Sequence, residues 1–210
     1  MLAKERIMDE HLHLSGFVLA GGRSARMGVD KARLEIAGVP LLVRTVELLK
    51  PYVDSVTVLA PADRYEFIQE PNLPDRWPGK GPLAAILTGL EHLRGEWGIF
   101  LACDLPLLDG RFIQMLARRA RAGNADAVVP RTAEGWQPLC AAYRRSSTQT
   151  IRQALEAGET AIIQVLPRLQ TDVLTPEELA TAGMDEIIFE NLNGPEDWKR
   201  VTKLLDAGAR

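Results

Sequence analysis

Short apolar runs alternate along the chain with longer segments in which apolar residues recur every three or four positions. Runs of the first kind predict buried strands, and segments of the second kind predict helices. The expected strands are residues 17–20, 55–59, 97–102, 127–130, 140–143 and 187–189. The expected helices are residues 40–50, 82–93, 110–122, 148–157 and 196–205. This alternation indicates an α/β fold in three layers, with a mostly parallel sheet covered by helices on both faces.

The chain shows no boundary between domains. No repeat, no linker rich in serine, glycine or proline and no shift in composition interrupts it after residue 15. We therefore expect one domain over residues 16–210. Residues 1–15 are polar and of mixed charge, and we expect a leader there, either flexible or a short extra helix.

Composition narrows the class of protein. With 25 Lys plus Arg against 28 Asp plus Glu, the net charge of −3 excludes a broadly basic nucleic-acid surface but still allows a local basic site for a phosphorylated ligand. The two cysteines, Cys103 and Cys140, lie in apolar runs without zinc-ligand spacing, so structural zinc and disulfides are disfavoured. No stretch approaches the roughly 20 apolar residues of a membrane helix, and the start lacks the apolar core of a signal peptide. We expect a cytoplasmic protein that binds small molecules.

Loops that follow strands are where ligands bind in such a sheet, outside the carboxyl ends of the strands. Four loops of this kind are expected, beginning at Gly21, Ala60, Cys103 and Glu190. The first is the most informative, because glycines and three cationic side chains follow a buried strand within a few residues. Glycines let backbone N–H groups approach phosphate oxygens, and cations offset phosphate charge. Its spacing matches neither the P-loop nor the dinucleotide-binding fingerprint.

Residues 19–31 read LAGGRSARMGVDK and resemble the signature L-x-G-G-x-S-x-R-M-G-x-D-K of the molybdenum cofactor guanylyltransferases, within the nucleotidyltransferase superfamily. The resemblance covers roughly residues 16–203 and implies the Rossmann-like fold of the nucleotide-diphospho-sugar transferases. It implies that the guanine nucleotide is held by Leu19, Ala20, Gly21 and Gly22. It also implies that Lys31 contacts the triphosphate, and Arg26 would join it at the phosphates.

Residues 75–84 read DRWPGKGPLA and are similar to the D-x-x-P-G-x-G-P-L-A motif of the same family. Taken alone this run could be a rigid connector. The resemblance implies that Asp75 and Gly81 belong to the nucleotide site.

Asp104 directly follows an expected strand, in Cys103-Asp104-Leu105-Pro106. A carboxylate there suits Mg²⁺, which binds one or two carboxylates together with substrate phosphates, although an aspartate can also cap a turn. In the family, C-D-x-P holds the magnesium aspartate, so the resemblance implies Mg²⁺ on Asp104.

Residues 191–197, NLNGPED, resemble the N-x-N-T-P-E-D element of the family, with Gly194 in place of threonine. The resemblance places Asn193 at the metal or the second substrate and Asn191 at the second substrate, while Asn193 could also cap the following helix. Residues 135–144 resemble a P-L-x-A-x-Y segment on the half that receives the pterin, which implies a role for Gln137. Trp136 beside Arg131 could stack on a ligand or belong to the core. Where the family often has asparagine after the second strand, this chain has Ala60 and Pro61.

The resemblance implies transfer of GMP from GTP to the phosphate of molybdopterin or the molybdenum cofactor, with pyrophosphate released. The N-terminal half would bind GTP and the C-terminal half the pterin, with partner proteins of cofactor biosynthesis as further candidates. Catalysis would rest on Arg26, Lys31 and Asp104. One alternative is a cytidylyl, uridylyl or sugar-phosphate nucleotidyltransferase of the same superfamily. Another is a GTP-binding module without turnover.

Overall fold

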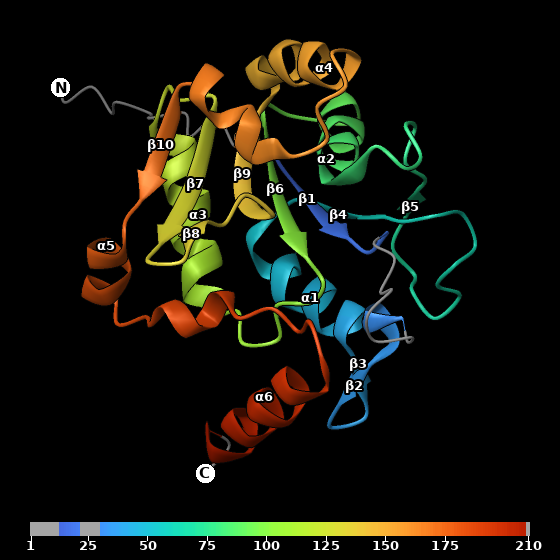
Figure 1. The fold of residues 1–210 in the computed structure, drawn as a ribbon, viewed down its shortest axis with the longest axis vertical. Coiled ribbons are helices and arrows are strands. Elements are labelled where there is room, and N and C mark those ends of the chain that lie inside the picture. The colour runs from blue at the N-terminus through green and yellow to red at the C-terminus, as the bar shows by residue number, and fades with distance from the viewer. Residues whose placement is uncertain (1–12, 22–29, 209–210) are drawn as a thin grey trace, which may run out of the picture.

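A single mixed sheet forms the centre of the computed structural model, which describes residues 13–21 and 30–208 (Figure 1). Its strands are β1 (Leu14–Leu19), β4 (Ser55–Leu59), β5 (Asn72–Leu73), β6 (Trp97–Ala102), β7 (Ala127–Thr132), β8 (Gly135–Trp136), β9 (Cys140–Arg144) and β10 (Thr171–Leu174). The order across the sheet is β10-β7-β9-β6-β1-β4-β5, and β8 pairs with β7. Pairing is parallel except around β9, which runs antiparallel to both β6 and β7, and between β7 and β8.

Helices cover both faces of the sheet, as the alternating pattern predicts (Figure 1). On one face, α1 (Leu41–Leu49) and α3 (Gly110–Ala122) pack into a core with Val18, Leu101 and Val128. On the other face, α2 (Gly81–Glu91) and α4 (Thr148–Glu156) pack against Phe17, Phe100 and Tyr143. The remaining helices are α5 (Pro176–Thr181) and α6 (Pro195–Gly208). The predicted three-layer architecture is confirmed.

Helix α2 approaches the sheet closely because Gly89 faces the ring of Phe100. A Cβ at Gly89 would lie 2.5 Å from Cε1 of that ring. The Phe100 ring stacks on Phe17, with ring centroids 4.8 Å apart, and meets Tyr143 edge-on at 5.7 Å. These aromatic contacts fix the height of α2 above β1 and β6, and so the position of the loop that leads into α2.

Smaller elements complete the chain. A hairpin of β2 (Glu35–Ile36) and β3 (Val39–Pro40) precedes α1. Short 3₁₀ helices are η1 (Lys31–Arg33), η2 (Lys50–Tyr52), η3 (Arg145–Ser147), η4 (Ile162–Gln164), η5 (Leu166–Arg168) and η6 (Glu186–Phe189). Among the described residues, no helix is both long enough and apolar enough to cross a membrane.

The predicted strand over residues 187–189 is wrong, because this segment forms the 3₁₀ helix η6. The side chain of Asp185 accepts a hydrogen bond from the Ile187 backbone N–H at 2.9 Å and starts that turn. Phe189 packs edge-on against Phe112 of α3, so burial here comes from a helix and not from the sheet. The loop at Glu190 therefore follows a 3₁₀ helix, while the other three expected loops follow β1, β4 and β6 as predicted.

Candidate functional site

The ends of β1 and β6 lie side by side at the centre of the carboxyl edge of the sheet. Cys103 N–H donates to the Leu19 carbonyl at 3.2 Å, and Ala20 N–H donates to the Leu59 carbonyl at 3.0 Å on the other side. The chain leaves β1 toward β4 and later returns to the opposite side of β1 as β6. Such a reversal of strand order opens a crevice for a ligand between the two strand ends. The predicted residues Leu19, Ala20 and Gly21 lie at its edge.

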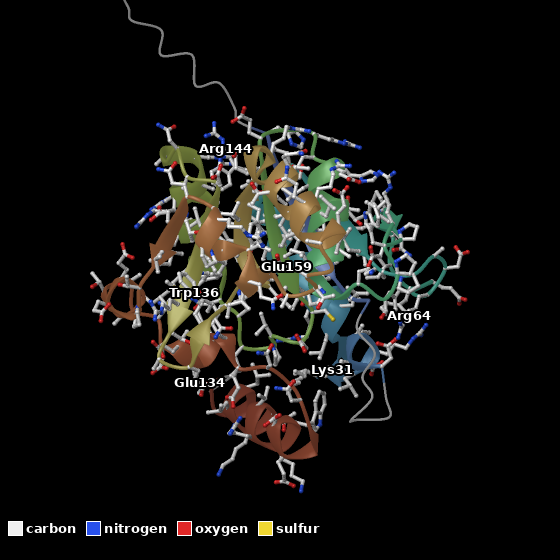
Figure 2. The ribbon with its side chains drawn as sticks, turned by 45° about the horizontal axis from the view of Figure 1, so that its top comes forward. Lys31, Arg64, Glu134, Trp136, Arg144 and Glu159 are labelled. Carbon is white, nitrogen blue, oxygen red and sulfur yellow. The ribbon has the colours of Figure 1, made fainter. Side chains whose placement is uncertain are left out.

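Lys31 reaches across this crevice from η1. Its Nζ lies 2.9 Å from Asp104 Oδ2 and donates to Asn193 Oδ1 at 3.2 Å. The side chains of Lys31 and Asp104 are only 19% and 22% exposed, so the ion pair is partly shielded from water. Three residues predicted from separate motifs thus meet at one point, and Figure 2 shows the position of Lys31.

The loop before α6 is tied to the end of β6. Leu192 N–H donates to the Asp104 carbonyl at 3.1 Å. The backbone N–H groups of Asn193 and Gly194 both donate to Asp197 Oδ2, at 2.9 and 3.0 Å. Asp197 therefore fixes the backbone at Gly194, where the family motif has threonine, and the Asn193 side chain turns toward Lys31 instead of serving only as a cap.

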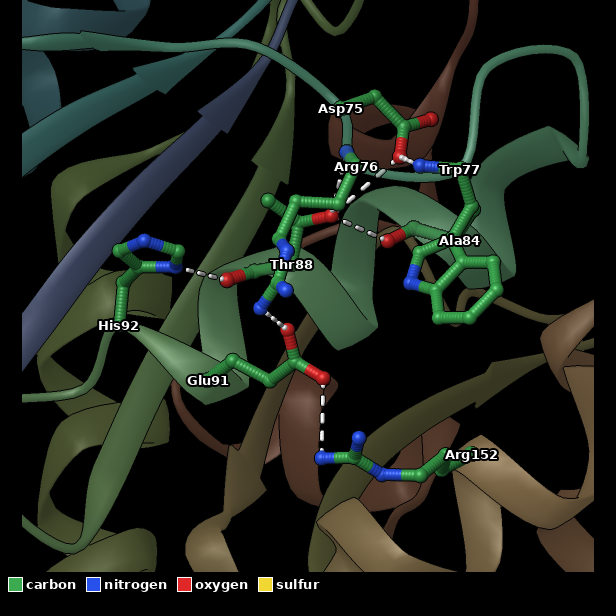
Figure 3. A network of polar contacts seen from close by, with 8 residues as sticks. All are labelled: Asp75, Arg76, Trp77, Ala84, Thr88, Glu91, His92 and Arg152. Carbon is green, nitrogen blue, oxygen red and sulfur yellow. Dashed lines mark hydrogen bonds and ion pairs between the residues drawn. The ribbon is translucent and has the colours of Figure 1, made fainter.

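Asp75 follows the edge strand β5 and shapes the loop that enters α2 (Figure 3). Its Oδ1 accepts from the Trp77 backbone N–H at 2.9 Å and from Thr88 Oγ1 at 3.3 Å. Glu91 of the same helix bridges Arg76 and Arg152 at 2.7 and 3.0 Å, which anchors the loop to α4. Among the described residues, none donates a hydrogen bond to Asp75 Oδ2, so this oxygen can accept hydrogen bonds from a ligand.

Gly81 begins α2 in a backbone conformation that other residues rarely adopt. Its φ is +72°, and a Cβ would lie 3.0 Å from the Thr160 carbonyl oxygen. That same carbonyl accepts from Leu83 N–H at 3.3 Å in the first turn of α2. Glycine here lets the connection between α4 and η4 lie directly against the start of α2.

A cleft of about 350 Å³ opens beside Asn193, between β7–β8 and the segment from η6 to α6. Gln137, Asn191 and Asn193 line it together, which brings together the three residues assigned to the pterin half. Gln137 Nε2 donates to Thr132 Oγ1 at 3.1 Å. Another cleft of about 320 Å³, along the outer side of α1, is lined by none of the predicted site residues.

Charged side chains also line the cleft beside Asn193, and none of them is among the site residues predicted from the sequence. Arg200 pairs with Glu190 and, at 3.3 Å, with Asp197. Both oxygens of Glu186 accept from the Ala133 backbone N–H, at 3.3 and 3.1 Å, which ties the tip of the β7–β8 hairpin to η6. Glu196 and Asp197 are the acidic residues at the end of NLNGPED, the run that resembles the N-x-N-T-P-E-D element, so the motif contained a signal for Asp197.

Trp136 and Arg131 form a cross-strand pair on β7 and β8. The Arg131 guanidinium carbon lies 5.3 Å from the centre of the Trp136 ring. The ring is half-buried and packs against the core on the α2 side of the sheet. Trp136 is thus both a core contact and a surface for a cation.

Cys103 precedes Asp104 but is buried at 8% exposure. Burial, and then the nearby carboxylates of Asp104 and Asp30, raise the pKa of the Cys103 thiol to about 12. The thiol therefore stays protonated near neutral pH and is not a nucleophile. Two further predicted residues, Gly22 and Arg26, lie outside the described residues.

The oxygen atoms at Asp104 and Asn193 are the donors that Mg²⁺ prefers, and Mg²⁺ commonly takes one or two carboxylates with substrate phosphates. The described residues contain no cluster of three or more His, Cys, Asp or Glu side chains that could hold a metal. One carboxylate and one amide oxygen therefore fit a metal that is shared with a phosphorylated ligand.

Comparison with known proteins assigns the chain to a family. The sequence profile of the MobA-like NTP transferase domain matches residues 16–172. The chain belongs to this family. Probable molybdenum cofactor guanylyltransferases of Nostoc sp. and Natronomonas pharaonis are 36% and 34% identical to it, over 88% and 91% of this chain and 88% and 98% of their own lengths. The chain is therefore a nucleotidyltransferase, as the resemblance implied.

Solved structures agree on the fold of this MobA-like transferase. Molybdopterin-guanine dinucleotide biosynthesis protein A from Archaeoglobus fulgidus superimposes with a TM-score of 0.82 at 23% identity, over 92% of this chain and 99% of that one. A CMP:2-keto-3-deoxy-manno-octonic acid synthetase also matches, with a TM-score of 0.70 at 15% identity, over 93% of this chain and 99% of that one. Asn193 lies beyond residues 16–172, so the candidate site includes a residue outside the segment that the profile matches.

Proposed function

We propose that the chain transfers GMP from GTP to the terminal phosphate of molybdopterin or its molybdenum-loaded form. The observation that carries the proposal is the meeting of Lys31, Asp104 and Asn193 at the carboxyl ends of β1 and β6, in a chain whose relatives are named probable molybdenum cofactor guanylyltransferases. A phosphate oxygen of the pterin attacks the α-phosphorus of GTP. The bond from that phosphorus to the bridging oxygen of the β-phosphate breaks, and pyrophosphate leaves.

Two polyanions must be brought together in this reaction, and the nucleophile is already ionised. The chain therefore needs no nucleophilic side chain and no general base; it has to position both substrates and offset their charge. Lys31 supplies a cation at the crevice, and we assign it to the triphosphate. Arg26 is proposed as a second cation there, and the backbone from Leu19 to Gly22 as the support for the nucleotide.

Asp104 and Asn193 would hold Mg²⁺ together with phosphate oxygens. When bound, the ion neutralises phosphate charge and helps to orient the transferred group. The chain keeps both ligands close, since the Leu192 hydrogen bond to the Asp104 carbonyl holds the two segments in register. Both lie within reach of Lys31, so the cation and the metal ligands act on the same phosphates.

Asp75 would read the guanine base. Guanine presents N–H donors at N1 and N2 along one edge, and a carboxylate is the acceptor that suits them. Oδ1 of Asp75 accepts hydrogen bonds from Trp77 and Thr88, while none of the described residues donates to Oδ2. Gly81 would let the same loop turn into α2 next to the nucleotide.

The cleft beside Asn193 would take the pterin end of the acceptor. Gln137 and Asn191 offer amide donors and acceptors of the kind that a pterin ring requires. The cleft adjoins Lys31 through Asn193, which would place the acceptor phosphate next to the triphosphate.

Equilibrium binding of GTP, CTP, UTP and ATP, each with and without Mg²⁺, tests base choice. We expect GTP to bind at least about tenfold more tightly than the others, followed by pyrophosphate release only when GTP, Mg²⁺ and molybdopterin are all present. Preference for CTP or UTP would assign the chain to another branch of the superfamily. GTP binding without pyrophosphate release in the complete mixture would indicate a binding module.

A further inference from the structure

Tyr65 lies in the connection between β4 and β5, and its hydroxyl reaches the Ala20 carbonyl directly after β1. The residue is buried, at 6% exposure. Its hydroxyl donates to the Ala20 carbonyl at 2.7 Å, and its oxygen also lies 3.1 and 3.2 Å from the two carboxylate oxygens of Asp30. One phenol group thus contacts two segments, the end of β1 and the residue before Lys31.

Both carboxylate oxygens of Asp30 have hydrogen-bond partners within the chain. Oδ1 accepts from the Ala32 backbone N–H at 3.2 Å and caps η1. Oδ2 accepts from Arg64 Nε at 3.0 Å. The carboxylate therefore sets the orientation of η1, the 3₁₀ turn from which Lys31 extends to Asp104.

A second contact holds the same segments together from outside. The Arg33 guanidinium donates to the Arg64 carbonyl at 2.6 Å and lies 5.6 Å from the centre of the Tyr65 ring. Figure 2 shows Arg64 on the same side of the molecule as Lys31. The Tyr65 connection and η1 thus form one packed unit.

The hydroxyl remains a donor over the physiological range. Burial, and then the negative charge of Asp30, raise the pKa of Tyr65 far above its ordinary value, although the nearby Arg64 opposes this shift. A protonated phenol has one hydrogen, which the Ala20 carbonyl and the Asp30 carboxylate share in a three-centre hydrogen bond, so this one hydroxyl holds both segments. Buried polar networks of this kind favour one arrangement of the groups that they join.

We propose that Tyr65 is a positioning residue for GTP: its hydroxyl holds Asp30 against the end of β1 and so aligns Lys31 with Ala20 at the nucleotide. This inference rests on the proposed function, since Lys31 must bind the triphosphate for its alignment to matter. Tyr65 itself touches no substrate in this proposal.

Tyr65→Phe is the informative variant, because it keeps the ring in the core and removes the hydroxyl alone. Tyr143→Phe is a matched control, since Tyr143 is also fully buried and its hydroxyl donates to the Pro138 carbonyl at the same 2.7 Å. Both variants lose one buried hydrogen bond to a carbonyl, so both should lose stability. Only Tyr65→Phe should weaken GTP binding.

The test is a double-mutant cycle with Lys31→Met, read as GTP affinity by titration calorimetry. We expect Tyr65→Phe to weaken GTP binding about fivefold in the parent and less than about twofold in the Lys31→Met background. In turnover assays of Tyr65→Phe the KM for GTP should rise as GTP binding weakens, while the KM for molybdopterin changes less than about twofold. If Tyr65→Phe does not fold, Arg64→Met removes the other partner of Asp30 and should show the same dependence on Lys31.

Three results distinguish a failure of the positioning role of Tyr65 from a failure of the proposed role of Lys31. If Lys31→Met weakens GTP binding but Tyr65→Phe does not, the positioning role is wrong and the proposed function stands. An equal loss from Tyr65→Phe with and without Lys31 would also overturn the positioning role, because the effect would not pass through Lys31. If Lys31→Met itself leaves GTP affinity unchanged, the assignment of Lys31 to the triphosphate fails.

Discussion

Lys31 Nζ lies 2.9 Å from Asp104 Oδ2 and bridges that carboxylate to Asn193, so the ammonium occupies the place between the two proposed metal ligands. The lysine and a bare metal ion therefore compete for the same oxygens. In Lys31→Met we expect Mn²⁺ alone to bind about three- to tenfold more tightly, because the competing charge is gone. GTP should bind at least about tenfold more weakly. Paramagnetic resonance of Mn²⁺ and calorimetry with GTP measure the two effects.

Lys50→Met is the matched control for this pair of effects. Lys50 also pairs with carboxylates, Glu47 and Glu70, each at 2.6 Å, but on the outer side of η2. Its loss should change neither Mn²⁺ nor GTP affinity. Weaker binding of Mn²⁺ in Lys31→Met would contradict the competition.

Asp104→Asn should abolish turnover while nucleotide binding is kept. The amide preserves the shape but loses the charge that a metal requires, so we expect pyrophosphate release to fall by at least about 100-fold. GTP affinity measured without metal should hold or improve, since one negative charge near the triphosphate is removed. Asp109→Asn, at the start of α3 where Asp109 accepts from Arg111 N–H, is the control and should keep full turnover. Normal turnover in Asp104→Asn would refute the metal assignment.

Gly81→Ala should cost more stability than Gly79→Ala, two residues earlier in the same loop. Both glycines have positive φ, +72° and +79°, and a Cβ at Gly79 would meet nothing within 4 Å. Each substitution carries the backbone cost of about 1 kcal/mol in the free energy of unfolding. Gly81→Ala adds the close contact with the Thr160 carbonyl, and we expect about 1 kcal/mol more. Urea unfolding of both variants decides this, and equal losses would mean that the segment at Thr160 moves away freely.

Stability should fall at alkaline pH because of buried thiol and phenol groups. Complete burial raises the pKa of the Cys140 thiol well above its ordinary 9.0. Above pH 9 the unfolded chain releases this proton and the folded chain keeps it, so the free energy of unfolding decreases as pH rises, by about 1.4 kcal/mol per pH unit for one group.

Cys140→Ala should therefore lower stability at pH 7 yet reduce the slope between pH 9.5 and 11 by about one proton. Val128→Ala truncates a buried side chain on the neighbouring strand β7 without removing an ionisable group, and its slope should match the parent. Urea unfolding across this pH range gives both slopes. The same slope in Cys140→Ala and the parent would show that the thiol does not titrate in this window.

Local pattern predicted most of the fold. The strands β1 and β6 are mostly apolar and buried along nearly their whole length, whereas in β4 the half-buried Ser55 and Thr57 alternate with buried apolar residues. Helix α3 presents Phe112, Leu116 and other apolar residues at helical spacing. These elements can therefore be predicted from neighbouring residues. The strand β1 begins at Leu14, three residues earlier than expected, because the polar Ser15 is buried between Gly98 and Ser55 on the adjacent strands.

Distant contacts decided the remainder. The edge strand β10 has the sequence Thr-Asp-Val-Leu, with no apolar run, and it was missed because its pairing with β7 depends on a partner more than 40 residues away. Asp172 of this strand pairs with Arg119 of α3 at 2.7 Å, a contact that no local pattern shows. The predicted strand at residues 187–189 is wrong because the burial of Phe189 against Phe112 cannot be seen from the residues of this segment alone.

The candidate site also combines residues that local motifs predict with residues whose roles depend on distant contacts. The motif residues Lys31, Asp104 and Asn193 were each found in the sequence, but only the fold shows that they meet. Tyr65, Arg200 and Glu186 belong to no quoted motif, and their roles come from contacts between segments far apart in the chain.

The hydrogen bond from Leu192 N–H to the Asp104 carbonyl joins two segments that are synthesised at different times. Protein synthesis proceeds from the N-terminus, so β1, β6 and Lys31 leave the ribosome well before Asn193 does. The sheet can form while its carboxyl edge still lacks the segment that completes the crevice. A nascent chain would thus expose both strand ends of the crevice before Asn193 emerges, and under the proposed function it could bind the metal with both ligands only after the last segment had been made.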